Sequence, residues 1–510
     1  MFIKGLSYSL FILITDVQPR KADILTRVHA PHDIRELKNV TSTSDRDYLP
    51  ELRVSDGKTG NKIACVENRG KGKGAGDNPL TQTLEAALKK YFGYDNFRYP
   101  QEEVINSVLR GKDVLAILAT GGGKSLCYQI PAIFRKGGMT LVISPLIALM
   151  KDQVSDLNER GINAFAWTSE CSLSEVERIK TSAKKGELQL VYVSPERAVM
   201  PSFLREISSW PVQCIAVDEA HCISLWGHQF RPEYCDLVII KAKFPDIPII
   251  AVTATATPMV QKEIIERLRL NAPDLFIGSF NRTNLNYKVR SRKNAYLDIL
   301  SYMRMNKEHS GIIYCTSKKD VGELSRKLRK DGQKAIPYHA GLSYKEREIN
   351  QELFRTGKAK IICATVAFGM GINKPDVRFV FHYGMPKSVE QYYQETGRAG
   401  RDGKEAECIL YYERSEYFRL RALIRTDNSQ EAFKKVSLAK LEQMLQYCET
   451  RDCRRKNLLA YFGEEANSDT CEQCDNCLSL PGEKKTGIKS WKNKNQDTHQ
   501  KISSIMEIRS

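Results

Sequence analysis

The sequence lacks an apolar run long enough to cross a membrane. The apolar patch near the N-terminus, residues 10–14, follows Lys4 but is far shorter than the roughly 20 residues that a spanning helix needs. Residues 15–19 offer no small-residue cleavage site of the kind that ends a signal peptide. These absences argue against a membrane or secreted protein, so we expect a soluble, intracellular protein with no membrane partner.

A disulfide framework is also missing, although the chain contains 14 cysteines. Most of them lie inside apolar runs, as is the case for Cys127, Cys214, Cys222, Cys315, Cys363 and Cys408. We expect these to be reduced thiols that pack as small hydrophobic side chains, which is typical of an intracellular protein.

Negative charge is in deficit, because 78 lysines and arginines against 61 acidic residues give a net charge of +17. This surplus and a pI near 9.1 favour a polyanionic partner, most simply nucleic acid. A generally basic, solvated surface is the alternative that charge alone leaves open. The length of 510 residues is enough for about three domains.

Residues 1–80 show no sustained periodicity and end in the glycine- and lysine-rich stretch 68–79. We predict a poorly ordered extension and a flexible linker there. Order is predicted to begin with an amphipathic helix over 84–92, which Gly93 ends. A second helix is predicted to start at Gln101 and to continue to about Arg110.

From Asp113 onward, short apolar runs alternate with amphipathic segments. The predicted strands form a first series at 114–119, 139–144, 190–194, 214–218 and 249–253, and a second series at 311–315, 335–339, 361–364, 379–382 and 408–412. Such alternation predicts parallel sheets with helices on both faces. We therefore expect an α/β fold of two similar lobes with a cleft between them and a boundary near 280–287.

A glycine turn follows the first predicted strand, at residues 121–123, and leads into Lys124 and Ser125. Strand, turn and helix start together form a nest of backbone N–H groups that suits phosphates. Lys124 would reach the β- and γ-phosphates of a nucleotide, and the Ser125 hydroxyl would bind Mg²⁺. The match to the phosphate-loop pattern is incomplete, because Leu118 stands where the first glycine belongs.

Two carboxylates, Asp218 and Glu219, follow the predicted strand 214–218. Side chains at the carboxyl end of a parallel strand lie where open α/β sheets bind ligands. Asp218 would hold Mg²⁺, and Glu219 would act as a base or orient the water that attacks the γ-phosphate. The plainer alternative is a capped helix start.

Two arginines, Arg398 and Arg401, lie three residues apart in the second series, within residues 394–403. At that spacing they are predicted to share one face of a helix. Phosphoryl transfer needs cations near the γ-phosphate, so an arginine from the second lobe would complete the site only when the cleft closes. For the pair taken alone, a solvated basic face is the alternative.

Three clustered cysteines follow two predicted helices at 436–448 and 453–462. Cys471, Cys474 and Cys477 can wrap one metal ion, with Cys453 as the fourth ligand of a tetrahedral zinc site. Cys448 is the weaker rival for the fourth position. An iron–sulfur cluster would need another cysteine shortly after Cys477, and none is present. The neighbouring Arg454 and Arg455 are predicted to be free for phosphate contacts.

Taken together, these motifs make residues from about 81 to 480 resemble the RecQ family of superfamily-two DNA helicases. The matching segments are 97–98 with Gln101, 120–125, 144–149, 218–221, 253–257, 368–375 and 394–403. Residues 222–234 resemble the aromatic-rich loop that separates this family from other DEAH-type proteins. Two departures stand out: Ala119 replaces the usual proline, and at most the beginning of a winged-helix domain is expected before Ser510.

The resemblance implies ATP-driven 3′→5′ DNA unwinding, in DNA repair, recombination and replication, by two RecA-like lobes and a small helical zinc module. The implied domains are lobe 1 over 81–284, lobe 2 over 285–420, the zinc-binding domain over 421–482 and a basic tail over 483–510. ATP, Mg²⁺ and Zn²⁺ are the implied cofactors. The implied partner is single-stranded, tailed or branched DNA on the chromosome, in a nucleoid or a nucleus.

The resemblance also assigns residues. It implies nucleotide binding by Tyr94, Arg98, Gln101, Thr120, Gly121, Gly122, Gly123, Lys124, Ser125 and Asp218, and catalysis by Lys124, Asp218, Glu219, Gln394, Arg398 and the finger Arg401. It implies DNA contact and coupling to hydrolysis by His221, Trp226, Phe230 and Arg231, where aromatic faces stack on unpaired bases. Core packing is the plain alternative for Trp226. A translocase that unwinds weakly and a non-catalytic DNA-binding or annealing protein are the alternative functions.

Overall fold

The computed structural model describes residues 83–135, 137–227, 230–369 and 374–479. The predictions for residues 1–80 and for the basic tail 483–510 lie outside these ranges. None of the described helices combines the length and the apolar content that crossing a bilayer requires. The cysteines within the described ranges are free thiols, and those predicted to pack in the core are buried.

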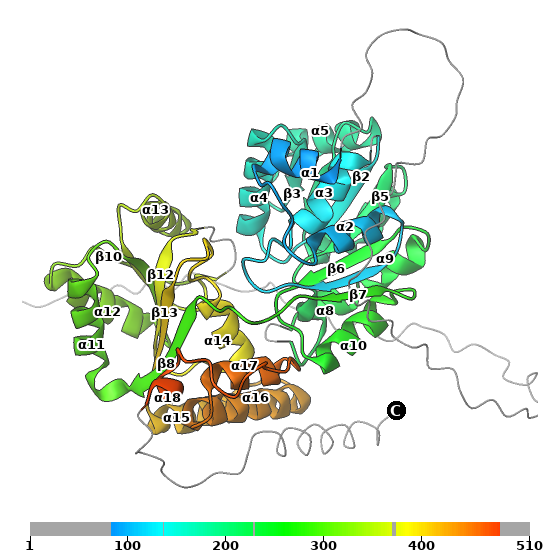
Figure 1. Cartoon of the computed structure of the whole chain (residues 1–510). Coiled ribbons are helices and arrows are strands. Elements are labelled where there is room, and N and C mark those ends of the chain that lie inside the picture. The colour runs from blue at the N-terminus through cyan, green and yellow to red at the C-terminus, as the bar shows by residue number, and fades with distance from the viewer. Residues whose placement is uncertain (1–82, 136, 228–229, 370–373, 480–510) are drawn as a thin grey trace, which may run out of the picture. The chain divides into compact units, whose positions relative to one another are not determined.

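The first lobe is built on a parallel sheet with the strand order β3-β4-β2-β5-β6-β1-β7. Its strands are β1 (Val114–Ile117), β2 (Met139–Ile143), β3 (Ala164–Trp167), β4 (Leu190–Val193), β5 (Val212–Val217), β6 (Ile249–Thr253) and β7 (Asp274–Ile277). Its helices are α1 (Leu84–Ala87), α2 (Gln101–Leu109), α3 (Leu126–Phe134), α4 (Ile147–Glu159), α5 (Leu173–Lys184), α6 (Pro195–Ala198), α7 (Pro201–Ile207), α8 (Pro232–Cys235), α9 (Val238–Lys243) and α10 (Pro258–Leu268). Figure 1 shows helices packed around this sheet.

The second lobe contains a six-stranded parallel sheet with the order β10-β11-β9-β12-β13-β8. Its strands are β8 (Leu285–Ser291), β9 (Ser310–Cys315), β10 (Ala335–Tyr338), β11 (Ile361–Ala364), β12 (Val377–Tyr383) and β13 (Ala406–Tyr412). Its helices are α11 (Ala295–Met305), α12 (Lys318–Lys330), α13 (Tyr344–Arg355) and α14 (Val389–Thr396). The two series of alternating strands and helices therefore form the two α/β lobes that the sequence predicted.

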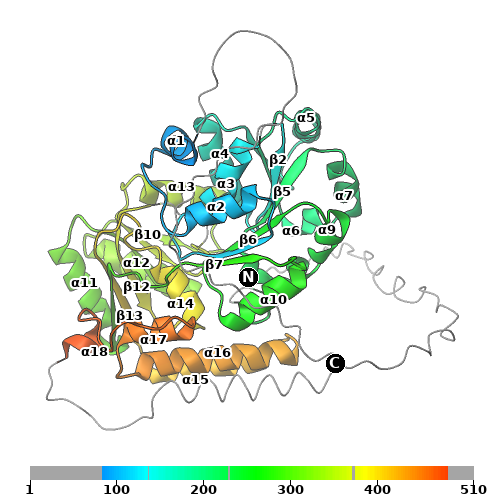
Figure 2. The same ribbon diagram turned by 45° about the vertical axis from the view of Figure 1, so that its right-hand side comes forward.

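A helical region follows the second sheet and contains α15 (Arg414–Thr426), α16 (Glu431–Glu449), α17 (Arg454–Tyr461) and α18 (Asp475–Leu478). Figure 2 shows α16 as a long helix beside α15. Helices α16 and α17 both contact α14 of the second lobe.

The inner strands β1, β2 and β6 of the first sheet are buried on both faces, as their apolar runs require. Successive residues of β1 point to opposite sides, so that Leu115 and Ile117 join one core cluster while Val114 and Ala116 join another. A continuous apolar run, without polar alternation, is therefore the pattern that a strand in the middle of such a sheet needs.

The structure corrects several details of the predicted elements. Strands β3, β7 and β8 were not predicted. The helix predicted over 84–92 divides into α1 and a π-helical turn at Leu88–Phe92, which Gly93 ends with a φ of 75°. Cys453 caps the N-terminus of α17 and does not lie inside the helix.

Candidate active site

The glycine turn after β1 leads into α3, which begins directly after Ser125. Gly121 and Gly123 have φ values of 83° and 74°, which favour glycine because other residues have a Cβ. A Cβ added at Gly122 would lie 2.8 Å from the carbonyl oxygen of Ala119. This local geometry accounts for three successive glycines despite the missing first glycine of the pattern.

Two of the residues predicted to bind the nucleotide, Arg98 and Gln101, lie against this turn. Gln101 donates from Nε2 to the carbonyls of Gly122 and Gly123 at 3.0 and 3.2 Å, and its Oε1 accepts from the Arg98 N–H at 2.8 Å. Arg98 donates from Nη1 to the Gly121 carbonyl at 2.8 Å. Tyr94 is 56% exposed and therefore accessible to a ligand. The structure thus brings Arg98 and Gln101 to the glycine turn.

Asp218 and Glu219 lie directly after β5, at the carboxyl edge of the sheet. Burial, and next the neighbouring Glu219 carboxylate, raise the pKa of Asp218 to about 7, although the Lys124 ammonium acts in the opposite direction. Glu219 has a φ of 49°, which is uncommon for a residue with a side chain and is typical of functional turns. This buried pair of carboxylates is suited to a divalent cation.

His221 connects the acidic turn to β6. Its Nδ1 lies 2.8 Å from Oγ1 of Thr253 and 3.3 Å from Oε2 of Glu219. Burial, followed by the positive charges of Lys124 and Lys440, lowers the pKa of His221 to about 3. The ring is therefore neutral at physiological pH. It hydrogen-bonds Thr253, and the same nitrogen lies close to the Glu219 carboxylate without forming an ion pair with it.

The aromatic-rich segment after this turn is mostly packed against the protein. Trp226 is buried in the core, whereas Phe230 and Arg231 are half-buried. The ammonium of Lys440, on α16, donates to the carbonyl of Trp226 and, at 2.8 Å, to that of Gly227. In this arrangement the Trp226 ring packs as a core residue, which is the plain alternative that its sequence context left open.

Lys440 also reaches the second lobe, because its Nζ lies 3.1 Å from Oε1 of Glu390 on α14. Both side chains are almost completely buried. One lysine therefore joins the aromatic-rich segment to the helix that precedes Arg398 and Arg401.

Arg398 and Arg401 do not share a helical face, so that prediction was wrong. Helix α14 ends at Thr396, and both arginines lie on the turn that follows it. The turn is set by glycines, since Gly400 has a φ of 54°. Gln394, on the last turn of α14, is buried.

This turn of the second lobe meets the glycine turn of the first. A Cβ added at Gly397 would lie 2.8 Å from Cβ of Thr120, and a Cβ added at Gly121 would lie 3.3 Å from Cγ of Arg401. Burial, then the neighbouring Arg398 and Arg282 guanidinium groups, lower the pKa of Arg401 to about 9. Positive charge is thus concentrated next to a turn built to hold phosphates, which favours a bound anion.

Four cysteine sulfurs form the candidate metal centre. The Sγ atoms of Cys453, Cys471, Cys474 and Cys477 all lie within 4.8 Å of one another. Tetrahedral zinc with Zn–S bonds of about 2.3 Å needs sulfurs about 3.8 Å apart, so the four thiols fit a single zinc ion. Backbone N–H groups of Cys474 and Cys471 donate to Sγ of Cys471 and Cys477 at 3.3 and 3.4 Å, which stabilises thiolates. Cys448, the rival fourth ligand, lies outside this group.

Arg454 and Arg455 are not free for phosphate contacts, contrary to the prediction. Both are buried, with exposed fractions of 4% and 7%. Arg454 forms an ion pair with Asp475 and donates to the Tyr447 carbonyl at 3.0 Å. Arg455 likewise donates to protein groups, among them Oδ1 of Asn281 at 2.9 Å and Oε1 of Gln473 at 2.6 Å. A buried guanidinium needs hydrogen-bond acceptors. Protein groups already accept the hydrogen bonds of both arginines, so neither side chain is available to a phosphate.

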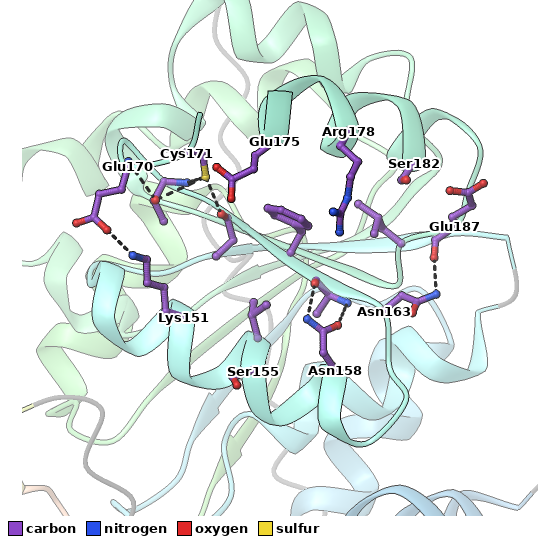
Figure 3. Close-up of a pocket in the computed structure, with 16 residues that line it drawn as sticks. Lys151, Ser155, Asn158, Asn163, Glu170, Cys171, Glu175, Arg178, Ser182 and Glu187 are labelled. Atoms are coloured by element: carbon purple, nitrogen blue, oxygen red, sulfur yellow. Dashed lines mark hydrogen bonds and ion pairs between the residues drawn. The ribbon is translucent and has the colours of Figure 1, made fainter. Parts of the chain in front are cut away.

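A cavity of about 570 Å³ lies away from these residues, along the edge strand β3 (Figure 3). It runs between α4, which carries Asn158, and α5, which carries Arg178. The Asn158 amide bonds both the N–H and the carbonyl of Ala164, at 3.0 and 3.1 Å, and so covers an edge that could pair with another strand. None of the predicted site residues lines this cavity.

Arg282 and Lys440 are the residues at the site that sequence reasoning missed. Neither belongs to a local pattern, because each contacts a carbonyl oxygen that lies more than 100 positions away in the chain. A single arginine or lysine outside any motif does not indicate a role at a functional site.

Three family models match the chain in succession. The DEAD/DEAH box helicase model matches residues 98–264, the helicase conserved C-terminal domain model matches 292–403, and the RecQ zinc-binding model matches 414–478. The last match covers the four-cysteine cluster, so the metal that this cluster is suited to hold is zinc.

Several curated proteins are similar to most of the chain. The ATP-dependent DNA helicase RecQ of Pasteurella multocida is 45% identical over 403 residues, which are 79% of this chain and 63% of that protein. RecQ of Bacillus subtilis is 42% identical over 400 residues, covering 78% of this chain and 67% of that protein. The ATP-dependent helicase SGS1 of Saccharomyces cerevisiae is 44% identical over 462 residues, or 88% of this chain and 32% of that protein. The chain thus spans about two thirds of the bacterial relatives' length and less of the yeast relative's.

Solved structures share the fold at low sequence identity. The DUF1998 helicase MrfA bound to DNA superimposes with a TM-score of 0.55 at 19% identity, over 76% of this chain and 59% of that chain. Helicase Lhr of Mycobacterium smegmatis, bound to ssDNA and AMP-PNP, gives a TM-score of 0.52 at 17% identity, over 71% of this chain and 57% of that chain. The two α/β lobes therefore have the arrangement of a RecA-like helicase core.

Proposed function

Because this chain belongs to the RecQ family of DNA helicases, we propose that it is an ATP- and Mg²⁺-dependent helicase that unwinds DNA in the 3′→5′ direction. The observation that carries the proposal is the meeting of the two lobes at Gly121 and Arg401. A phosphate-binding turn from one lobe and an arginine from the other form one nucleotide site. Both lobes therefore contact the nucleotide, so that a change from ATP to ADP alters the contacts of both.

The proposed roles follow from position and charge. The glycine turn and Lys124 hold the phosphates of ATP, while Ser125 and Asp218 hold Mg²⁺, which neutralises phosphate charge when it is bound. Glu219 orients the attacking water, and Arg401 stabilises charge on the γ-phosphoryl group as it transfers. Tyr94, with Arg98 and Gln101 beside the turn, receives the adenine.

The remaining proposed assignments concern DNA, metal and domains. Phe230 and Arg231 contact DNA, and the buried His221 and Trp226 couple that contact to hydrolysis. The four clustered cysteines bind zinc. Lobe 1 comprises residues 81–284, lobe 2 comprises 285–420, and the zinc-binding domain comprises 421–482. The substrate is chromosomal DNA with a single-stranded tail or a branch, which agrees with the net charge of +17.

Strand displacement tests the proposal. The purified chain should release the labelled strand from a duplex with a 3′ single-stranded tail when ATP and Mg²⁺ are present, and should leave a duplex with a 5′ tail intact. Lys124→Ala is the control, because it removes the cation that holds the phosphates and should abolish release. Release of the 5′-tailed duplex would refute the polarity, and ATP hydrolysis without release from either duplex would identify a translocase.

A further inference from the structure

Arg282 lies on the segment between β7 and β8 and donates to carbonyl oxygens of both lobes. Its Nη1 lies 2.9 Å from the carbonyl oxygen of Thr120 in the first lobe. In the second lobe, its Nη1 lies 3.4 Å from the carbonyl of Gly397, and its Nη2 lies 2.9 Å from those of Ala399 and Gly400. The planar, multiply donating guanidinium is the side chain suited to hold several acceptors at once.

The second-lobe carbonyls that Arg282 holds surround the two arginines of the nucleotide site. Gly397 and Ala399 flank Arg398, and Gly400 directly precedes Arg401. Asn284 supports the same turn, because its Nδ2 donates to the carbonyls of Gly400 and Lys404 at 2.9 and 2.8 Å. The segment between the lobes therefore helps to fix the backbone that carries Arg401, together with hydrogen bonds from Gly400 to Val377 and from Asp402 to Pro375.

The acceptors of Arg282 leave its charge in place. Carbonyl oxygens are neutral, so they orient the guanidinium without cancelling its charge. Arg282 is accordingly one of the groups that depress the pKa of Arg401, after burial and Arg398. The charge of Arg282 thus adds to the positive potential at the site, which favours a bound anion.

Arg455 of the zinc-binding region in turn fixes the segment that carries Arg282. Its guanidinium donates to Oδ1 of Asn281 at 2.9 Å and to the carbonyls of Arg282 and Leu285 at 2.6 and 2.8 Å. It also donates to Oε1 of Gln473, within the cysteine cluster, at 2.6 Å. A continuous set of hydrogen bonds therefore runs from the cysteine cluster to the turn that bears Arg401.

We propose that Arg282 is a positioning residue for ATP hydrolysis, which joins the phosphate-binding turn to the arginine turn and is itself held by Arg455. It does not contact the reacting atoms, and it acts by setting the backbone of Arg398 and Arg401. This inference rests on the proposed ATPase function. The inference gives the zinc-binding region a second role: besides stabilising its own fold, this region aligns the nucleotide site.

Steady-state ATP hydrolysis with saturating single-stranded DNA tests the inference. Arg282→Gln should lower kcat about 10- to 100-fold, as expected when a catalytic group is misplaced, while KM for ATP changes less than about threefold. Arg290→Gln is the matched control, because Arg290 lies on β8 and forms a half-exposed ion pair with Asp298 at 3.2 Å. It should hydrolyse ATP like the wild type.

A double-variant cycle separates positioning from a general structural role. If Arg282 acts through Arg401, then Arg282→Gln should lower kcat by less than about twofold in the Arg401→Ala background. Effects that multiply in the double variant, an unchanged kcat in Arg282→Gln, or a loss confined to KM would each overturn the inference. If Arg282→Gln does not fold, Arg282→Lys, which keeps the charge but not the planar fork, takes its place in the same cycle. A wild-type protein that ignores single-stranded DNA would instead refute the proposed function.

Discussion

Two pairs of arginines, Arg454 with Arg455 and Arg398 with Arg401, differ in what surrounds them. Arg454 has a carboxylate partner: burial by itself would lower its pKa, yet the hydrogen bond and charge of Asp475 raise it. Arg401 lies near Arg398 and Arg282, and burial with this repulsion lowers its pKa to about 9. Arg454 therefore has a negative charge beside it, whereas Arg401 lies next to further positive charge. Such a concentration of positive charge is a mark of a functional site, because a bound anion relieves the repulsion.

Removing Arg401 should have the largest effect on activity. Arg401→Ala is expected to lower the DNA-stimulated kcat for ATP by about 10³-fold or more, because the transferring phosphoryl group loses its cation. Its melting temperature should be unchanged or slightly raised, since a buried like-charge repulsion disappears. Steady-state kinetics and thermal melting of the same preparation check both outcomes. A destabilised variant with normal turnover would contradict the contrast between the pairs.

Removing Arg454, which pairs with Asp475, should act on stability instead. Arg454→Ala leaves Asp475 without its partner and is expected to lower the free energy of unfolding by about 3–5 kcal/mol. Urea unfolding measures the change. Arg414→Ala is the control, because Arg414 pairs with Glu449 at 3.5 Å on the surface and should cost about 1 kcal/mol or less. Equal losses in the two variants would mean that the burial of Arg454 does not matter.

Lys440 is another buried cation, and it extends the comparison because it bonds both a carboxylate and the aromatic-rich segment. The double variant Lys440→Met with Glu390→Gln removes the cation without leaving a charged carboxylate buried alone. We expect the stimulation of ATP hydrolysis by single-stranded DNA to fall about fivefold or more, with the DNA-free rate retained. Glu390→Gln alone keeps the lysine on the loop carbonyls and should preserve the stimulation. Equal stimulation in the double variant would remove Lys440 from the coupling route.

Asp218 is the anionic counterpart of Arg401 and should show the smallest effect, on stability. Its pKa of about 7 lies above the ordinary value near 3.8, so the folded chain keeps a proton that the unfolded chain releases. This group therefore costs stability as pH rises from about 4, and the cost is complete above about 7. In the absence of Mg²⁺ and nucleotide, Asp218→Asn should melt above the wild type at pH 8, by about 2–4 °C for each kcal/mol regained.

The same comparison at pH 5 provides the control for Asp218. There the wild-type carboxyl is mostly protonated in the folded chain, so the difference between Asp218→Asn and the wild type should shrink. A difference in melting temperature that stays the same between pH 5 and pH 8 would contradict the raised pKa.

Local sequence patterns predicted correctly the features that are determined by residues close together in the chain, namely the inner strands and the glycine turn. The apolar runs around β1 and β6 are buried on both faces, so their sequence carries the strand signal without any tertiary knowledge. The turn at 121–123 was also predictable, because three successive glycines directly after an apolar run are a local signal. The edge strands β3 and β7 were missed because short runs beside helices do not stand out, and β8 was missed because its alternation falls on the predicted boundary.

Long-range contacts explain the predictions that failed. The sequence around Arg454 and Arg455 looks like an exposed basic helix start, and only the folded chain brings Asp475, Asn281 and Leu285 to them. The spacing of Arg398 and Arg401 suggested a helix, but Gly397 and Gly400 end it and form a turn. Burial of charge depends on partners from distant positions, which a local pattern does not contain.

DNA-stimulated ATP hydrolysis tests the central claim, that the turn at 121–125 and Arg401 form one DNA-controlled nucleotide site. The release of phosphate by the intact chain is measured with Mg²⁺ and ATP, with and without single-stranded DNA. We predict that the DNA raises the rate at least about tenfold, and that Lys124→Ala and Arg401→Ala abolish the increase. A rate that is indifferent to single-stranded DNA, or an increase that persists in Arg401→Ala, would contradict this account.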